Sequence, residues 1–72
     1  MESTTNYECV WTCTRGRTRL RCELHDCSGE VELEVRRNSR LYGNYRFRER
    51  LAALDFAVRL RDLVAGNGWV AA

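Results

Sequence analysis

Apolar and polar residues alternate along the first half of the chain, which is the pattern of half-buried β-strands. The alternation predicts three strands, at about residues 7–13, 18–24 and 30–36. Each has one apolar face, and the polar positions between are mostly Thr, Arg and Glu. Glu8 falls on the polar face of the first strand. The residues expected to face the core are Tyr7, Cys9, Trp11 and Cys13, then Leu20, Cys22 and Leu24, then Val31, Leu33 and Val35.

Short segments rich in turn-forming residues separate these strands. Residues 14–17 include Gly16, which can supply the positive φ that a tight hairpin needs. Residues 26–29, Asp-Cys-Ser-Gly, favour a second turn, and residues 37–40 form a third. The three strands are therefore expected to run antiparallel as a meander.

Residues 41–47 allow two interpretations. They form a short fourth strand at the sheet edge if Leu41, Tyr45 and Phe47 face the core. They form a loop if Gly43 and Asn44 interrupt the segment. The pattern alone leaves both open.

From about residue 48 to residue 65 the apolar spacing changes to three and four, which predicts an amphipathic helix. Three alanines within it add helix propensity. Gly66 suits a left-handed C-cap, and Asn67-Gly68 favours the end of the helix. Trp69 and Val70 are then expected to fold back onto the helix or the sheet edge.

Strands followed by a helix define an α+β fold. We predict an antiparallel β-meander of three strands, or four if residues 41–47 form one, packed on one C-terminal α-helix. The 72 residues suffice for one small domain, which we place at residues 7–72, after a flexible N-terminus at residues 1–6. A hydrophobic content of 44% and a charged content of 31% fit a globular chain.

The net charge of +2 conceals a segregation of charge. All twelve basic residues are arginine, and most fall in two blocks, residues 15–21 and 36–50, with acids between them at residues 23–34. In a meander the first and third turns lie at the same end of the sheet, so their arginines should cluster there. The second turn, with Asp26 and Glu30, should lie at the opposite end beside Glu8.

Clustered arginines attract phosphate, because binding releases counterions and the planar guanidinium pairs well with phosphate oxygens. An exposed antiparallel sheet can also enter the major groove of DNA. We therefore expect a non-enzymatic binding module whose arginine-rich end engages nucleic acid or another polyanion. The proposed contact residues are Arg15, Arg17, Arg19, Arg36, Arg37 and Arg40.

Two other interpretations of the charges stay open. The arginines on the second strand neighbour Glu32 and Glu34 on the third, and such pairs form a solvated face that contributes only a few tenths of a kcal/mol each. The arginines can also engage an acidic protein. In that case the chain is a small protein-binding regulator or inhibitor, of the kind found in bacteria and phages.

A protein partner would use other residues. Tyr42, Tyr45 and Trp69 have neighbouring arginines, and Trp, Tyr and Arg dominate the energetics of protein interfaces. An exposed strand edge can also pair with a second copy of the chain, giving a homodimer.

Four cysteines in so short a chain raise the question of zinc. The spacings Cys9-x3-Cys13 and Cys22-x4-Cys27 are not those of a zinc knuckle, and residues four apart on a strand lie roughly 13 Å apart. The first hairpin should place Cys9 opposite Cys22 on the core face. A cluster of Cys9, Cys22, His25 and Cys27 is the zinc alternative, if the second turn folds inward. Buried free thiols are expected instead, with no cofactor.

Catalysis is not expected. Cys27 near His25 is the one nucleophile–base pair of an enzyme hypothesis, but a turn on a small domain offers no oxyanion hole or pocket. No apolar run approaches the roughly 20 residues that span a bilayer, and the N-terminus lacks the features of a secretory signal. The expected location is the cytoplasm.

The order of elements resembles two DNA-binding groups, the arm-binding domain of phage-type tyrosine recombinases and the plant ethylene-response-factor domain. In the latter a third strand leads through a glycine and an aromatic residue into an alanine-rich helix, as Val35, Gly43, Tyr45 and Ala52-Ala53 do here. The resemblance is one of layout over about residues 15–60, and it implies DNA binding by the sheet. Glutamates on the open sheet face depart from it.

Overall fold

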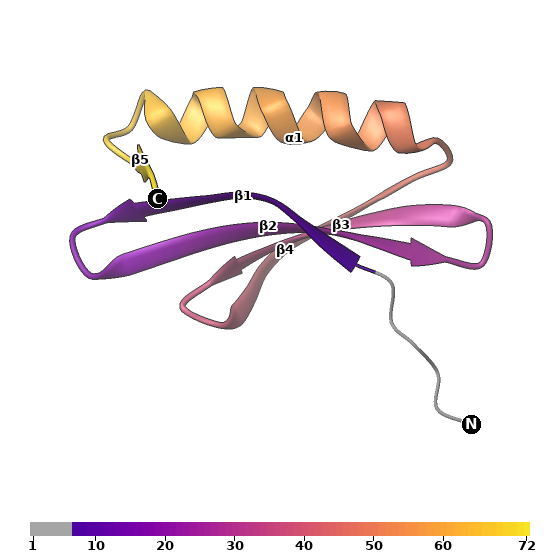
Figure 1. Cartoon of the computed structure of the whole chain (residues 1–72), viewed down its shortest axis with the longest axis horizontal. Helices are drawn as coiled ribbons and strands as arrows, with labels where there is room; N and C mark the ends of the chain where they lie inside the picture. Colours follow the sequence, from indigo (N-terminus) through magenta and orange to yellow (C-terminus); the bar gives the residue numbers. More distant parts are fainter. Residues whose placement is uncertain (1–6) are drawn as a thin grey trace.

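A computed structural model describes residues 7–72; the expected flexible segment, residues 1–6, lies outside the described residues. Within these described residues, five antiparallel strands form one sheet in the order β4-β3-β2-β1-β5, and a single helix lies across one of its faces (Figure 1). The elements are β1 (Tyr7–Arg15), β2 (Thr18–Cys27), β3 (Glu30–Arg37), β4 (Arg40–Phe47), α1 (Arg50–Ala65) and β5 (Val70–Ala71). The α+β prediction is confirmed, and residues 41–47 belong to a strand.

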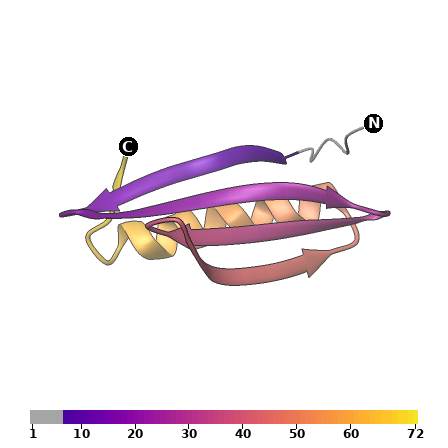
Figure 2. The same ribbon diagram turned by 90° about the horizontal axis from the view of Figure 1, so that it is seen from below.

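The core lies between the sheet and α1. Ala53 and Ala57 are fully buried, and their small side chains let the helix approach the strands closely. The indole Nε1 of Trp11 donates a hydrogen bond of 2.8 Å to the carbonyl oxygen of Ala57, so the ring joins the two layers. Seen from below, the sheet lies in front and α1 behind it, which leaves one face of the sheet uncovered (Figure 2).

The first and third turns lie at the same end of the sheet, as predicted, and the third turn is hydrogen-bonded to the start of β2. Gly16 has a φ of 61°, as expected for the first hairpin, while Asn38 and Ser39 in the third turn have φ values of 51° and 74°. The backbone N–H of Asn38 donates to the carbonyl of Arg19 at 3.0 Å, and the Asn38 Oδ1 accepts from the N–H of Arg19 at 2.9 Å. This reciprocal pair fixes the third turn against β2.

The helix ends differently from the prediction. Gly66 has a φ of −66° and is right-handed, so it is not the left-handed cap. Gly68, with a φ of 91°, takes that role: its N–H bonds to Ala65 and the next N–H, of Trp69, bonds to Val64. The chain then folds back onto the sheet edge, as expected, and β5 pairs with β1. No helix within residues 7–72 is long and apolar enough to cross a membrane.

A β-bulge in β1 overturns part of the predicted face assignment. Cys9 pairs with Glu23 but Trp11 pairs with Cys22, so Val10 is an extra residue and the alternation shifts by one. Consequently Tyr7 and Cys9 lie on the uncovered face of the sheet, not on the core face. Glu8, expected on the uncovered face, lies on the helix side and forms an ion pair with Arg50 of α1.

A second bulge divides β4. Gly43 pairs with Val35 and Leu41 with Arg36, which leaves Tyr42 as the extra residue. Tyr45 packs on the core as predicted, since its ring lies 4.8 Å from that of Phe56, and Phe47 does the same. The bulge turns Leu41 to the uncovered face, where it is 54% exposed, so its predicted core position was wrong.

Candidate functional site

A groove of about 660 Å³ lies on the uncovered face of the sheet. It extends from the middle of the sheet to the end where the first and third turns lie. We call it the arginine groove, because four arginines and one glutamate line it. Its lining residues are Tyr7, Arg17, Arg19, Arg21, Glu23, Arg36, Asn38 and Ser39.

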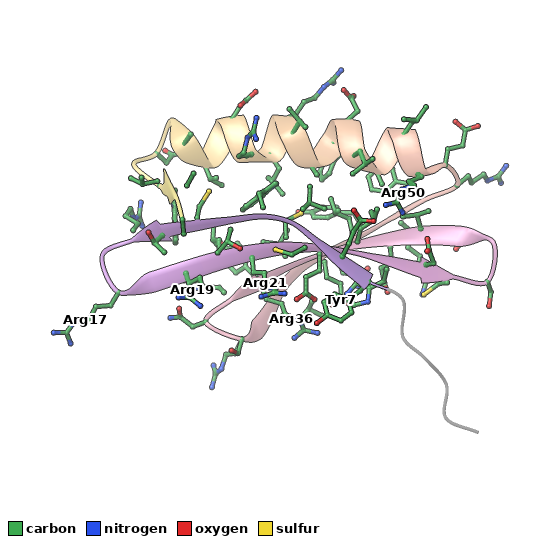
Figure 3. The ribbon with its side chains drawn as sticks, viewed as in Figure 1. Tyr7, Arg17, Arg19, Arg21, Arg36 and Arg50 are labelled. Carbon is green, nitrogen blue, oxygen red and sulfur yellow. The ribbon has the colours of Figure 1, made fainter. Side chains whose placement is uncertain are left out.

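Strand geometry explains why the arginines share this face. Arg19 and Arg21 alternate along β2, so both side chains point away from the helix. Arg36 lies directly opposite Arg21 on β3, and Arg17 follows Gly16 in the first turn. All four arginine side chains extend away from α1 (Figure 3).

Direct cross-strand pairs in the groove carry like charge, contrary to the simple pairing of arginine with glutamate expected from the sequence. Arg21 lies opposite Arg36, and Glu23 lies opposite Glu34. Such neighbours repel unless opposite charges interleave with them. Here the opposite charges do interleave. Arginine and glutamate alternate along β2 and along β3, and an arginine of β3 also lies diagonally across from a glutamate of β2.

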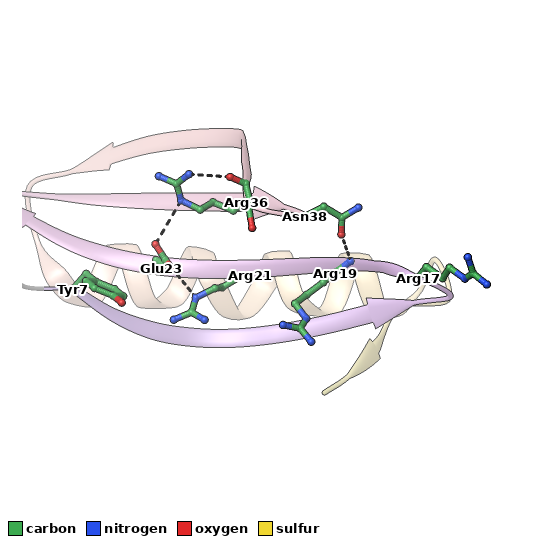
Figure 4. Close-up of a pocket in the computed structure, with 8 residues that line it drawn as sticks. Tyr7, Arg17, Arg19, Arg21, Glu23, Arg36 and Asn38 are labelled. Atoms are coloured by element: carbon green, nitrogen blue, oxygen red, sulfur yellow. Dashed lines mark hydrogen bonds and ion pairs between the residues drawn. The ribbon is translucent and has the colours of Figure 1, made fainter.

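Glu23 is the centre of this network, and only 8% of its surface is exposed. Its carboxylate lies 2.6 Å from the Nε of Arg21 and 3.7 Å from the Nε of Arg36 (Figure 4). Arg36 also places its Nη2 3.0 Å from the Oε1 of Glu34. A buried carboxylate needs such partners, so Arg21 and Arg36 are held in place and largely neutralised.

His25 completes the network. Its Nε2 lies 3.2 Å from the Oε1 of Glu23 and 3.4 Å from the Oε1 of Glu34, so three potential metal ligands converge within 4.8 Å. Arg36, however, contacts the same two carboxylate oxygens. A cation would have to displace this guanidinium, and the arrangement is best described as a charge network.

The zinc alternative drawn from the sequence is not assembled. Cys22 is completely buried on the helix side, whereas Cys9 and Cys27 are exposed and Cys9 lies opposite Glu23, not opposite Cys22. Burial raises the pKa of the Cys22 thiol to about 12, which disfavours the thiolate that a metal requires. All four cysteines are free thiols.

The arginines proposed from the sequence are divided between the two faces of one end. Arg17, Arg19 and Arg36 lie in the arginine groove. On the helix side, Arg15 lies 4.8 Å from the Trp69 ring and Arg37 lies 5.9 Å from the Tyr42 ring. Within residues 7–72 the arginines that form no ion pair with a carboxylate include Arg15, Arg17, Arg19, Arg37 and Arg40.

The opposite end of the sheet is less acidic than the sequence implied. Glu8 pairs with Arg50, and Glu30 lies 3.4 Å from Arg46. The end of β4 and the start of α1 therefore deliver arginines to the end that carries the second turn. The charge asymmetry arises mainly from unpaired arginines at one end and not from unpaired acids at the other.

The aromatic residues proposed for a protein interface do not form one patch. Tyr42 is 66% exposed, Tyr45 packs partly on Phe56, and Trp69 is half-buried against Arg15. Tyr42 and Trp69 border a smaller hollow of about 270 Å³ on the helix side. Tyr45 is not among its lining residues.

The contact set predicted from the sequence omits five of the lining residues: Tyr7, Arg21, Glu23, Asn38 and Ser39. For Arg21 the alternation predicts the correct face, but as one of the solvated charges. For Tyr7 regular alternation predicts a core position, which is wrong. The adjacent apolar residues Val10 and Trp11 break that alternation, and this was the available signal of the bulge.

No protein-family model matches this chain, and neither the curated proteins nor the solved structures compared with it include a significant match. The resemblance to the two DNA-binding groups is thus limited to the order of the elements. The case for a function therefore depends on the arginine groove itself.

Proposed function

We propose that the protein is a small non-enzymatic binding module whose arginine-rich end engages nucleic acid through the arginine groove. The observation that carries the proposal is the pair Arg17 and Arg19. Both are exposed at one end of the groove, and neither forms an ion pair within residues 7–72. Two unpaired guanidiniums at one end of the groove favour a ligand with repeated negative charge.

The charge network supports this proposal. Glu23 and Glu34 hold Arg21 and Arg36 in fixed positions, and the reciprocal bonds between Asn38 and Arg19 fix the backbone beside them. Preorganised donors lose less conformational entropy on binding than free side chains do. Arg17 and Arg19 then supply the net electrostatic attraction. Arg21 and Arg36 define the wall of the groove and offer the N–H groups that their carboxylate partners leave free.

The proposal modifies the contact set drawn from the sequence. Arg36 stays in it, but as a residue already engaged by two carboxylates. Three of the predicted arginines lie toward the other face of the sheet: Arg15, Arg37 and Arg40. They extend the positive electrostatic potential around the same end of the molecule. Phosphates are therefore expected first at Arg17 and Arg19.

Fluorescence anisotropy with labelled oligonucleotides tests the proposal. The wild type should bind at low salt, and Arg17→Ala/Arg19→Ala should bind more weakly. The log–log slope of affinity against salt should also become shallower by about 1.4, from about 0.7 for each phosphate contact on a single strand. Arg59→Ala/Arg61→Ala is the charge-matched control on α1, where Arg59 pairs with Asp55. Absence of binding by the wild type at low salt would refute the proposal.

A second candidate is a protein-binding regulator that acts through β4, including self-association. The observation that favours it is the exposure of Leu41 and Tyr42, 54% and 66%, on a strand at the edge of the sheet. Sedimentation velocity over a range of concentrations tests for a dimer. A dimer that Tyr42→Asp dissociates supports this candidate, and a monomer at all concentrations removes self-association.

A further inference from the structure

The arginine groove ends in an exposed aromatic ring. Tyr7 lines the groove and is 53% exposed. Its ring stacks on that of His25, with centroids 5.4 Å apart and planes at 18°. His25 is in turn fixed between Glu23 and Glu34. Tyr7 is thus an aromatic surface supported from one side by a ring that cannot move freely.

We propose that the groove binds single-stranded nucleic acid and that Tyr7 stacks on one of its bases. This inference rests on the proposed function, because it names the class of nucleic acid that the same groove takes. Base–aromatic stacking is the means by which proteins hold single strands without reading a sequence. A base at Tyr7 would place the following phosphates toward Arg19 and Arg17.

The length of the groove fits a short single strand. Tyr7 pairs with His25 on β2, and Arg17 precedes the other end of that strand. Eight residues separate positions 17 and 25, which is about 26 Å at the rise of an antiparallel strand. That length suits on the order of four nucleotides, the smallest site size of single-strand-binding folds.

The charges inside the groove favour a single strand over a duplex. Between Tyr7 and the unpaired arginines, Glu23 and Glu34 neutralise Arg21 and Arg36, so this stretch attracts a continuous row of phosphates only weakly. A single strand can turn its bases toward this neutral stretch and keep its phosphates at the arginine end. In a duplex the bases are already stacked, so Tyr7 gains nothing from it.

Three fluorescein-labelled probes of equal length separate stacking from charge: oligothymidine, an abasic deoxyribose-phosphate strand, and a duplex. The wild type should bind oligothymidine more tightly than either of the others. Tyr7→Ala should weaken oligothymidine binding about 5- to 150-fold, since stacking contributes about 1–3 kcal/mol per base, and should leave the abasic strand within about twofold. Tyr7→Phe, which keeps the ring, should restore binding. Circular dichroism confirms that each variant is folded.

The outcomes distinguish this inference from the function it rests on. Equal binding of oligothymidine and the abasic strand, both unaffected by Tyr7→Ala, would refute stacking while leaving polyanion binding in place. Tighter binding of the duplex would also refute it. If none of the three probes binds at low salt, the proposed function fails together with the inference.

Discussion

Asn38 offers the sharpest test of how the arginine-rich end is built. It contributes two separable features to the third turn: a side-chain oxygen that accepts from the N–H of Arg19 at 2.9 Å, and a left-handed backbone with a φ of 51°. Asn38→Gly removes the first feature and keeps the second. Asn38→Ala removes the first and strains the second.

The lost hydrogen bond and the backbone strain have comparable effects on the free energy of unfolding. A side-chain hydrogen bond of this kind contributes about 1 kcal/mol, and a left-handed alanine costs about another 1–2 kcal/mol. Asn38→Gly should therefore lower the free energy of unfolding by about 1 kcal/mol and Asn38→Ala by about 2–3 kcal/mol. Against the roughly 3–5 kcal/mol that a core of this size supplies, the alanine variant is marginal.

Thermal and urea unfolding followed by circular dichroism measure both variants. For a domain of this size each kcal/mol shifts the Tm by about 4–8 °C, so glycine and alanine should be resolved from each other. Asn38→Asp is the control that keeps both an acceptor and tolerance of left-handed backbone. It should retain most of the stability but, by adding a carboxylate to the groove, weaken oligonucleotide binding.

The reasoning is refuted if alanine and glycine destabilise equally, because the backbone term would then be absent. It is also refuted if both lie within about 0.3 kcal/mol of the wild type, since the hydrogen bond between the third turn and β2 would then contribute nothing. The Asn38→Asp variant tests separately whether Asn38 lies beside the bound oligonucleotide. Unchanged binding would mean that it does not.

Three further outcomes are expected. Ser39→Gly should raise the free energy of unfolding by about 1 kcal/mol, because Ser39 has a φ of 74°, a conformation in which hairpins prefer glycine. An unchanged midpoint of urea unfolding would contradict this. Trp11→Phe should lower the free energy of unfolding by about 2 kcal/mol, because the 2.8 Å hydrogen bond to Ala57 is lost and the ring is smaller. A loss below about 0.5 kcal/mol in urea unfolding would show that the hydrogen bond is dispensable. The contribution of Cys22 to stability should be constant below pH about 9 and be lost as the pH rises toward 12, because burial raises its pKa and only the unfolded state ionises it freely. Urea titrations of Cys22→Ala between pH 9 and 12 should therefore show a weaker decline than the wild type, and an equal decline would contradict this.

The sequence predicted the regular parts of the fold because their patterns are local. In β2 and β3 every leucine and valine faces the core without interruption, so alternation alone assigns Leu20, Leu24 and Leu33 correctly. The meander also placed the first and third turns at one end. β5 has only two residues and pairs through backbone bonds, so no periodicity could reveal it.

The candidate site was predicted only in outline. Its unpaired members Arg17 and Arg19 follow from turn and strand positions, which the sequence indicates. The neutralisation of Arg21 and Arg36 depends on register and side-chain direction, which place them opposite each other and beside Glu23. Tyr7 entered the site through the bulge at Val10, and the energetic choice of a bulge depends on the packing of the whole sheet.

That bulge has a consequence for how the protein can change over generations. The arginine end varies by substitution, one codon at a time, since each arginine stands at its own position. The aromatic end depends on whether β1 keeps its bulge. If the bulge were lost while Val10 is retained, regular alternation would exchange Tyr7 and Glu8 between the two faces, although neither residue had mutated. Loss of the Val10 codon would instead leave both residues on their present faces, because Cys9 would still pair with Glu23. This end of the groove is therefore most sensitive to changes that disfavour the bulge, at positions that need not line the groove at all.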